Sequence, residues 1–374
     1  MNLPWDIVAR AVVDGVAVRR GDRVAISLTG VESYAAALAV VRECHQRGAH
    51  PQVVLAADDF DRDALASAPL DLLATPGPLE LAAVAWADAY VALRPMTPPP
   101  SVAGPVDTHR IAAQRLGKGG VSAARWSVDR WVVVRIPTTE WAQYVDVDAE
   151  VIGREFMAGV TTDWAAHRPH WQELAASLTS CSQVEIVDAD THLVLPTTGR
   201  TWVVFDGAAN LPDGEIATAP VDDGTYGHLT IPGSFSFADT RFTNLRLRFE
   251  AGRCVDVRAD EGEELARALL AADGGSDRIG ELGIGVNPGV RTPVGDLFID
   301  EKILGTVHIA LGRAYPQCGG TNSSSIHWDI VKDLRGAGGR LTADDLVLIS
   351  NGVPQPPLLR ADHRPSHASD RSLS

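Results

Sequence analysis

The sequence predicts an α/β N-terminal domain, built on a parallel sheet with flanking helices, followed by an α+β domain that is mainly antiparallel β. Three observations predict this fold class. The chain has 374 residues, which is more than one ordinary hydrophobic core accommodates. Aliphatic runs alternate with helical stretches before Cys181, and short strand-like runs separated by Gly, Pro and Asp turns follow it. We therefore expect domains at residues 1–180 and 181–355, with a disordered tail at 356–374.

The N-terminal domain begins with a strand and a helix. Residues 23–29 are rich in aliphatic side chains and follow a Gly-Asp pair, which favours a buried strand. Residues 31–48 carry four apolar side chains at helical spacing, Tyr34, Leu38, Val41 and Cys44. Three more aliphatic runs predict strands at 52–56, 89–93 and 131–136. A strand–helix–strand order implies a parallel sheet covered by helices.

Residues 138–180 are predicted to be helical and to connect the two domains. Their apolar side chains are expected in the core because large aromatic residues are usually buried there: Trp141, Tyr144, Val151, Phe156, Trp164, Trp171 and Leu174.

Strand and turn signals dominate after Cys181. Short apolar runs at 184–187, 193–195 and 202–205 favour strands. Residues 245–249 and 254–258 alternate in polarity around a turn that contains Gly252, which predicts a β-hairpin. The second half is therefore expected to be mainly antiparallel.

Composition and charge exclude two classes of partner. The formal net charge is -15, and such a surface repels nucleic acid and anionic lipid. No run approaches the roughly 20 apolar residues of a membrane span, and charges interrupt the first residues where a signal peptide would have its apolar core. We expect no nucleic-acid or membrane partner and a cytoplasmic location. The four cysteines are spaced singly, without a zinc or redox motif.

Two histidines and an aspartate in the C-terminal half are candidates for a metal site. On a strand, His327 and Asp329 would point to one side and Trp328 to the other. Alone, such a pair is more often a hydrogen-bonded pair on a sheet surface. His308 lies in a second apolar run between glycines. Because histidine and carboxylate bind Zn, Co, Mn or Fe, the three together indicate a metal-binding C-terminal domain.

Two glutamates extend this candidate site. Glu281 lies among apolar residues and glycines, which is a costly place for an unpaired charge. Glu215 follows a turn and would, on sequence alone, be interpreted as an ordinary turn carboxylate. Glu301, just before the His308 run, is a candidate for orienting a ligating histidine.

Four stretches carry a family resemblance. They are NLPDGEIATAPVDDGTYGHLTIPGSF at 210–235, ELGIGVNPG at 281–289, DEKILGTVHIALGRAY at 300–315 and GGTNSSSIHWDIV at 319–331. In this order they resemble the M29 metallopeptidases, the aminopeptidase T group of leucyl-type aminopeptidases. The resemblance covers residues 5–350, with its specific motifs within 210–331.

The resemblance implies a dinuclear site with five ligands, Glu215, Glu281, His308, His327 and Asp329. It also implies two divalent metal ions (Zn, Co, Mn or Mg), removal of N-terminal residues from small peptides or related amides, and a homodimer. Tyr315 matches the family's active-site tyrosine and would donate a hydrogen bond to the oxyanion. We expect Glu281 to act as proton shuttle as well, because apolar surroundings could raise its pKa.

Other functions remain open at this point. The 2,5-dihydroxypyridine dioxygenases resemble the same family and use a single Fe held by two histidines and a carboxylate. In those enzymes a histidine takes the place of Glu281, so the glutamate favours a hydrolase. An amidase acting on a non-peptide substrate and a non-catalytic binding protein are further alternatives.

Overall fold

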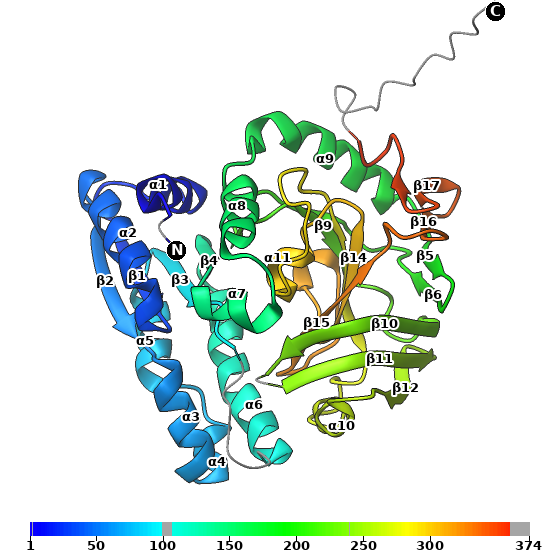
Figure 1. The fold of residues 1–374 in the computed structure, drawn as a ribbon, viewed down its shortest axis with the longest axis horizontal. Coiled ribbons are helices and arrows are strands. Elements are labelled where there is room, and N and C mark those ends of the chain that lie inside the picture. The colour runs from blue at the N-terminus through cyan, green and yellow to red at the C-terminus, as the bar shows by residue number, and fades with distance from the viewer. Residues whose placement is uncertain (2, 99–106, 239, 360–374) are drawn as a thin grey trace, which may run out of the picture.

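The computed structural model of the chain describes residues 1, 3–98, 107–238 and 240–359. In Figure 1 the N-terminal sheet and its helices lie on the left and the antiparallel strands on the right, with α7 (Thr139–Val145) and α8 (Ala149–Val160) between them. The predicted fold class is confirmed: the first part is α/β with a parallel sheet, and the second is mainly antiparallel.

The N-terminal sheet has five parallel strands in the order β2-β1-β3-β4-β8. Their bounds are Arg23–Leu28 (β1), His50–Leu55 (β2), Ala89–Pro95 (β3), Trp131–Ile136 (β4) and Asn210–Leu211 (β8). The first four are the aliphatic runs that predicted strands. Because β8 comes from beyond residue 181, the chain returns to this sheet after the helical connection.

Helices cover both faces of this sheet, and their bounds are Trp5–Gly15 (α1), Tyr34–Gln46 (α2), Asp58–Ser67 (α3), Leu70–Leu73 (α4), Pro78–Trp86 (α5) and Thr108–Arg125 (α6), with a 3-10 turn at Val31–Ser33 (η1). One apolar cluster joins α1, α2 and α8 to one face of the sheet. A second cluster, which includes Trp131 of β4, places α5 against the other face.

The helix predicted from the spacing of Tyr34, Leu38, Val41 and Cys44 is confirmed as α2, but these four residues do not form one buried face. Tyr34 is 64% exposed and Leu38 is 37% exposed. The helix instead packs through a stripe of smaller side chains, Ala36, Ala37, Ala39, Val40 and Cys44. The small alanine side chains let the helix lie close to the sheet, so the larger residues are left on its outer side.

Residues 138–180 form the predicted helices α7, α8 and α9 (Trp164–Thr179). Trp141, Phe156, Trp171 and Leu174 are buried as expected. Tyr144 is 37% exposed, and its hydroxyl lies 2.8 Å from Ser236 Oγ. The expectation that it is a core residue is therefore wrong.

Two antiparallel sheets form the rest of the chain. The larger has the order β12-β11-β10-β6-β5-β16-β17-β18 and the smaller the order β15-β14-β13-β9-β7. The bounds in the larger sheet are Gln183–Asp188 (β5), Thr191–Pro196 (β6), Tyr226–Phe237 (β10), Thr240–Glu250 (β11), Arg253–Arg258 (β12), Arg340–Ala343 (β16), Leu346–Ser350 (β17) and Val353–Pro354 (β18). Those in the smaller sheet are Val203–Phe205 (β7), Glu215–Thr218 (β9), Ile279–Gly285 (β13), Thr306–Gly312 (β14) and His327–Asp333 (β15).

The predicted hairpin is confirmed as β11 and β12, where Leu247 pairs with Val257. The remaining elements are Glu263–Leu270 (α10), Leu297–Asp300 (α11) and the 3-10 turn Pro316–Cys318 (η2). Trp328 of β15 is fully buried, and its ring lies 5.1 Å from that of Phe242 on β11. Aromatic packing thus joins the two antiparallel sheets.

The structure describes only the first four residues of the predicted tail. Residues 356–359 form a turn in which Leu358 is buried, so the beginning of the predicted tail is folded. Residues 360–374 lie outside the described residues. The division at residue 180 stays a prediction.

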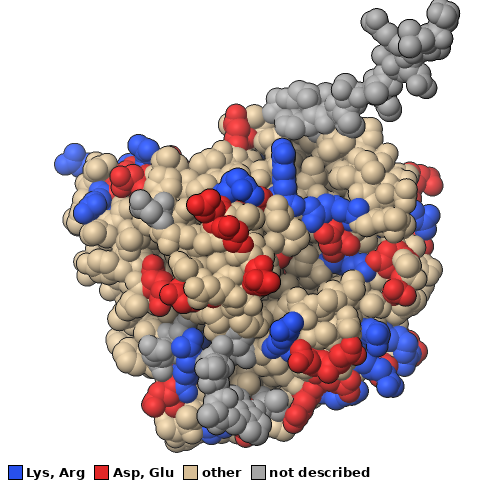
Figure 2. Space-filling view, in the orientation of Figure 1, with Lys and Arg blue, Asp and Glu red and all other residues tan. Residues whose placement is uncertain are grey.

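The face of the molecule drawn in Figure 2 carries charges of both signs. Acidic and basic side chains are interspersed over the face shown in Figure 2, without a large area of one sign. In the part of the chain that the structure describes, no helix combines the length and apolarity needed to cross a membrane.

Candidate metal centre

Neighbouring strands of the smaller sheet carry the five predicted ligands. Glu215 begins β9, Glu281 lies in β13 and His308 in β14. His327 and Asp329 lie in β15. These strands are adjacent in the sheet, so residues separated by more than a hundred positions meet on one surface.

The strand register brings these residues to one face. Gly283 is paired with His308, while Ala310 is paired with Glu281 on one side and Asp329 on the other. Because side chains two residues apart on a strand share a face, the ligands all project from the same side. Trp328, between His327 and Asp329, enters the core on the opposite side, as its position predicted.

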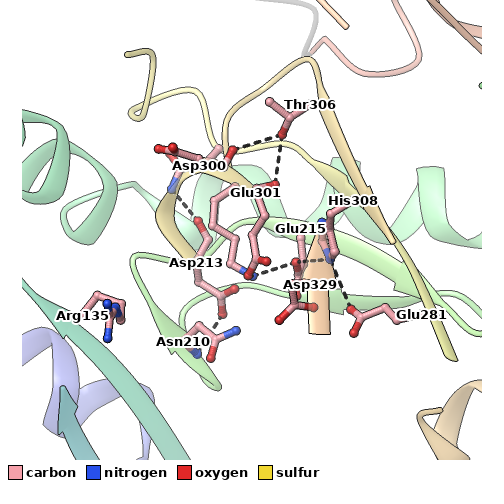
Figure 3. Close-up of polar contacts among 12 residues, drawn as sticks. Arg135, Asn210, Asp213, Glu215, Glu281, Asp300, Glu301, Thr306, His308 and Asp329 are labelled. Atoms are coloured by element: carbon pink, nitrogen blue, oxygen red, sulfur yellow. Dashed lines mark hydrogen bonds and ion pairs between the residues drawn. The ribbon is translucent and has the colours of Figure 1, made fainter. Parts of the chain in front are cut away.

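Glu281 lies between two groups of ligand atoms. His308 Nε2 is 3.5 Å from Glu215 Oε2 and 3.4 Å from Glu281 Oε1. His327 Nε2 is 3.1 Å from Glu281 Oε2 and 3.4 Å from Asp329 Oδ1. Figure 3 shows Glu215, Glu281, His308 and Asp329 pointing toward one another. Two three-ligand groups, each with its ligand atoms within 4.8 Å of one another, therefore share one glutamate.

One nitrogen of the cluster is buried without a partner. Within the described residues, His308 Nδ1 makes no hydrogen bond, whereas Glu215 Oε2 and Glu281 Oε2 are held only by the ion pairs with Lys302 and His327. An unsatisfied buried polar atom is costly, and native structures rarely keep one without a reason. The donor set of carboxylates and imidazoles is the one that divalent transition metals accept. The residues present therefore fit a metal site.

One histidine is fixed in orientation by its second nitrogen. His327 Nδ1 lies 3.1 Å from the backbone oxygen of Arg313. A carbonyl oxygen can only accept, so Nδ1 must donate the proton. The lone pair of a neutral imidazole is then on Nε2, which faces Glu281 and Asp329. This backbone contact prepares His327 as a ligand.

The clustering of these carboxylates raises the pKa of both histidines. Burial disfavours the imidazolium, but Glu301, Glu281 and Glu215 raise the pKa of His308 to about 9. Burial acts likewise on His327, and Asp329 and Glu281 raise its pKa to about 10. Both shifts have one cause, which is the concentration of carboxylates around two buried imidazoles.

The expectation that Glu281 has a raised pKa is wrong. Burial does favour its neutral form, but His308 and His327 outweigh burial and lower its pKa well below the usual range. The two histidines, which the apolar local sequence does not reveal, decide the sign.

Lys302 is a member of the cluster that sequence reasoning missed. Its side chain is fully buried, and Nζ lies 2.7 Å from both Glu215 Oε2 and Glu301 Oε1. Burial raises the pKa of Glu301 to about 8. Glu301, with His308 and Asp329, also forms a third group of converging ligand atoms. The signal for this pair was the charged Asp-Glu-Lys run at 300–302, three residues before the apolar strand β14.

Tyr315 borders the same centre. Its ring lies 5.6 Å from the ring of His327 and 4.9 Å from that of Trp126. Burial and the carboxylates Glu281, Glu215 and Asp329 raise its pKa well above the usual value. Tyr315 and the five predicted ligands all line one cleft of about 610 Å³ between the two halves of the molecule. A substrate in this cleft would meet a hydroxyl donor beside the candidate ligands.

The sequence model of the thermophilic metalloprotease (M29) family matches residues 7–345. Aminopeptidase 2 of Geobacillus stearothermophilus is 27% identical over 59% of this chain and 60% of its own length. Aminopeptidase T of Thermus thermophilus is 36% identical over 29% of this chain and 27% of its own. The matched part thus spans less than two thirds of the length of each of these curated relatives.

Two solved structures share the fold. Aminopeptidase T of Thermus thermophilus superposes with a TM-score of 0.73 at 21% identity, covering 94% of this chain and 98% of that one. A 2,5-dihydroxypyridine dioxygenase from Pseudomonas putida has a TM-score of 0.59 at 14% identity, covering 94% and 97%. At these identities the likeness concerns the fold alone. The family match, in contrast, extends over nearly the whole sequence, and by it the chain belongs to the M29 family of metalloproteases.

Proposed function

We propose that the protein is a metal-dependent aminopeptidase that hydrolyses the N-terminal peptide bond of small peptides at a dinuclear centre. The observation that carries this proposal is the shared position of Glu281 between two groups, Glu215–His308 and His327–Asp329. Two groups that share a carboxylate favour a pair of ions over a single one. The aminopeptidase names of the relatives support the choice of reaction.

Each side chain has a distinct proposed role. Glu215, Glu281, His308, His327 and Asp329 would hold two divalent ions (Zn, Co, Mn or Mg). When bound, such ions lower the pKa of a shared water and polarise the carbonyl that is attacked. Glu281 would also hold the proton released by the water, because its carboxylate belongs to both groups. Tyr315 would donate a hydrogen bond to the oxyanion, a contribution of about 3 kcal/mol to transition-state stability.

The test combines metal analysis with hydrolysis of aminoacyl anilides. We expect two equivalents of Zn, Co or Mn in the purified protein, and loss of turnover in Glu281→Gln by at least about a hundred-fold. Glu264→Gln, at an exposed position of α10, is the matched control and should retain activity. Near-normal turnover in Glu281→Gln would exclude the assigned role.

The same experiment separates the alternatives. One Fe per chain with oxygen uptake would indicate ring cleavage by a dioxygenase. Two metal ions without anilide hydrolysis would indicate an amidase acting on a non-peptide substrate. Protein that takes up no metal would be a binding protein. The homodimer and the cytoplasmic location stay predictions.

A further inference from the structure

Basic side chains line the cleft beside the candidate metal centre. Seven lysine or arginine residues border it, although the whole chain has a net charge of -15. Two of them are neutralised locally: Lys118 pairs with Asp61, and Arg135 pairs with Asp296. Within the described residues, three others, Arg94, Arg125 and Arg313, have no carboxylate at ion-pair distance.

Arg125 is the most enclosed of the three. It ends helix α6, is only 9% exposed, and its guanidinium lies 4.3 Å from the centre of the Trp131 ring. Its Nε makes no hydrogen bond, and the hydrogen bond from Nη2 to Ser122 Oγ is long at 3.5 Å. Burying a charge without an opposite charge is strongly unfavourable. An anionic ligand beside this guanidinium would remove that cost.

Arg313 approaches the same space from the other half of the molecule. It follows strand β14, and its Nη1 is buried without a hydrogen bond among the described residues. Its backbone oxygen is the acceptor that orients His327, and its side chain lines the same cleft as the candidate ligands. Arg94, at the end of β3, lines the same cleft and is more exposed.

The guanidinium group of Arg125 is repelled by those of Arg94 and Arg313. Burial, and then the nearby charge of Arg94, lower the pKa of Arg125 to about 9, and Arg313 contributes in the same direction. Burial also lowers the pKa of Arg313, although Asp329 and Glu281 oppose the shift. Once divalent cations occupied the metal centre, those carboxylates would already be neutralised. The arginines therefore do not serve to balance the metal ligands.

An aromatic wall connects the arginines with the metal centre. Tyr315 lies 4.9 Å from Trp126, and Trp126 lies 4.9 Å from Trp131, on which Arg125 stacks. A substrate lying along this wall would have one end at the ligands and the other at the guanidinium groups. Aromatic and aliphatic surface suits the body of a peptide, and arginine suits a terminal anion.

We propose that Arg94, Arg125 and Arg313 form a carboxylate-binding subsite, so that the substrates are short peptides or amides that carry a carboxylate close to the cleaved bond. Guanidinium binds carboxylate in a paired geometry with charge-assisted hydrogen bonds. The carboxylate has two possible sources in a peptide: the C-terminus of a dipeptide or an acidic side chain. The proposal rests on the proposed peptidase function and narrows its substrate class.

Two pairs of substrates identify which carboxylate of the peptide is bound. Leucyl-leucine is compared with leucyl-leucinamide, and glutamyl-p-nitroanilide with glutaminyl-p-nitroanilide. We expect the acid of one pair to have a kcat/KM about ten-fold above its amide, mainly through KM. Arg125→Gln should reduce kcat/KM about ten-fold more for that acid than for its amide, whereas Arg42→Gln, on the exposed side of α2, should change neither. Equal rates within both pairs, or equal losses for both members, would overturn the subsite.

A binding measurement keeps this test independent of catalysis. Isothermal titration of the metal-free protein with succinate should show a Kd about ten-fold higher in Arg125→Gln than in the unmodified chain. Succinate that does not bind, or that binds both proteins equally, would contradict the proposal. If no peptide or anilide is hydrolysed but succinate binds as expected, the peptidase function fails and the anion subsite stands.

Stability distinguishes ligand binding from a structural role. Removing an unpaired buried charge should leave the Tm of ligand-free Arg125→Gln equal to or above that of the unmodified chain. A lower Tm would mean that Arg125 supports the fold. If Arg125→Gln does not fold, Arg313→Gln allows the same substrate and succinate comparisons.

Discussion

At the scale of single residues, Gly283 sets the space available to a candidate ligand. It is paired with His308 on the neighbouring strand, and a Cβ at this position would lie 2.0 Å from His308 Cε1. Such an overlap cannot be tolerated without moving the ring. The close approach of an imidazole to bare backbone therefore requires glycine here.

Gly283→Ala is predicted to displace His308. We expect metal affinity and turnover to fall by about ten- to a hundred-fold, because metal ligands must be held to within about half an ångström. Metal titration and anilide hydrolysis measure the two effects. Gly274→Ala, where a Cβ meets nothing within 4 Å, is the matched control. Unchanged metal affinity in Gly283→Ala would mean that His308 is not a ligand.

At the scale of secondary-structure elements, Glu155 links helix α8 to the segment after β13. Its Oε2 accepts hydrogen bonds from the backbone N–H groups of Arg291 (2.8 Å) and Thr292 (3.2 Å). Burial favours the neutral acid, but these backbone donors outweigh it and lower the pKa of Glu155 below the usual value of 4.5. The carboxylate thereby holds in place a segment whose Val290 and Val294 pack in the N-terminal core.

Glu155→Gln should lower the free energy of unfolding by about 1 kcal/mol at pH 7, because charge-assisted hydrogen bonds are replaced by neutral ones. A lowered folded-state pKa stabilises the fold above the unfolded-state value, and this stabilisation is lost as pH falls through the folded-state pKa. The difference between the two proteins should therefore shrink below about pH 4.5. Urea denaturation at several pH values measures it.

The control for this prediction is Glu150→Gln, at an exposed position of the same helix, which should be neutral. A difference between Glu155→Gln and the unmodified chain that stays constant or grows toward pH 4 would show that the carboxylate charge is not what stabilises the contact.

At the scale of the whole molecule, the candidate centre connects strands from distant parts of the chain. Its candidate ligands come from β9, β13, β14 and β15. Residues of the N-terminal half line the opposite side of the cleft. A ligand that binds only the folded protein stabilises it by mass action. Metal binding should thus stabilise the entire chain rather than a local segment.

Metal removal is predicted to lower the Tm. At a metal concentration of about a hundred times Kd, the gain is about 2.7 kcal/mol, or about 3 °C for a chain of this size. Thermal denaturation after chelation and after addition of Zn, Co or Mn checks this value. Glu281→Gln should lose the increase. A Tm that does not respond to any of these ions would speak against a metal centre at these residues.

The sequence by itself determined most of the secondary-structure elements and the residue types of the candidate ligands. The parallel strands followed from aliphatic runs, the β11–β12 hairpin from alternation, and the common face of His327 and Asp329 from the two-residue period of a strand. These properties depend on residues close together in the chain. Helix α2 was the exception, since its buried side depends on how closely the sheet approaches.

Only the tertiary structure decided how distant charges act on one another. It placed Glu281 between His308 and His327, which lowers the pKa that its apolar sequence neighbours would have raised. It also brought Lys302 to Glu215, and Arg125 toward Arg313 across the cleft. Coulomb interactions and burial depend on separation in space, and strand register and domain packing, which set that separation, cannot be read from the sequence near any one of these residues.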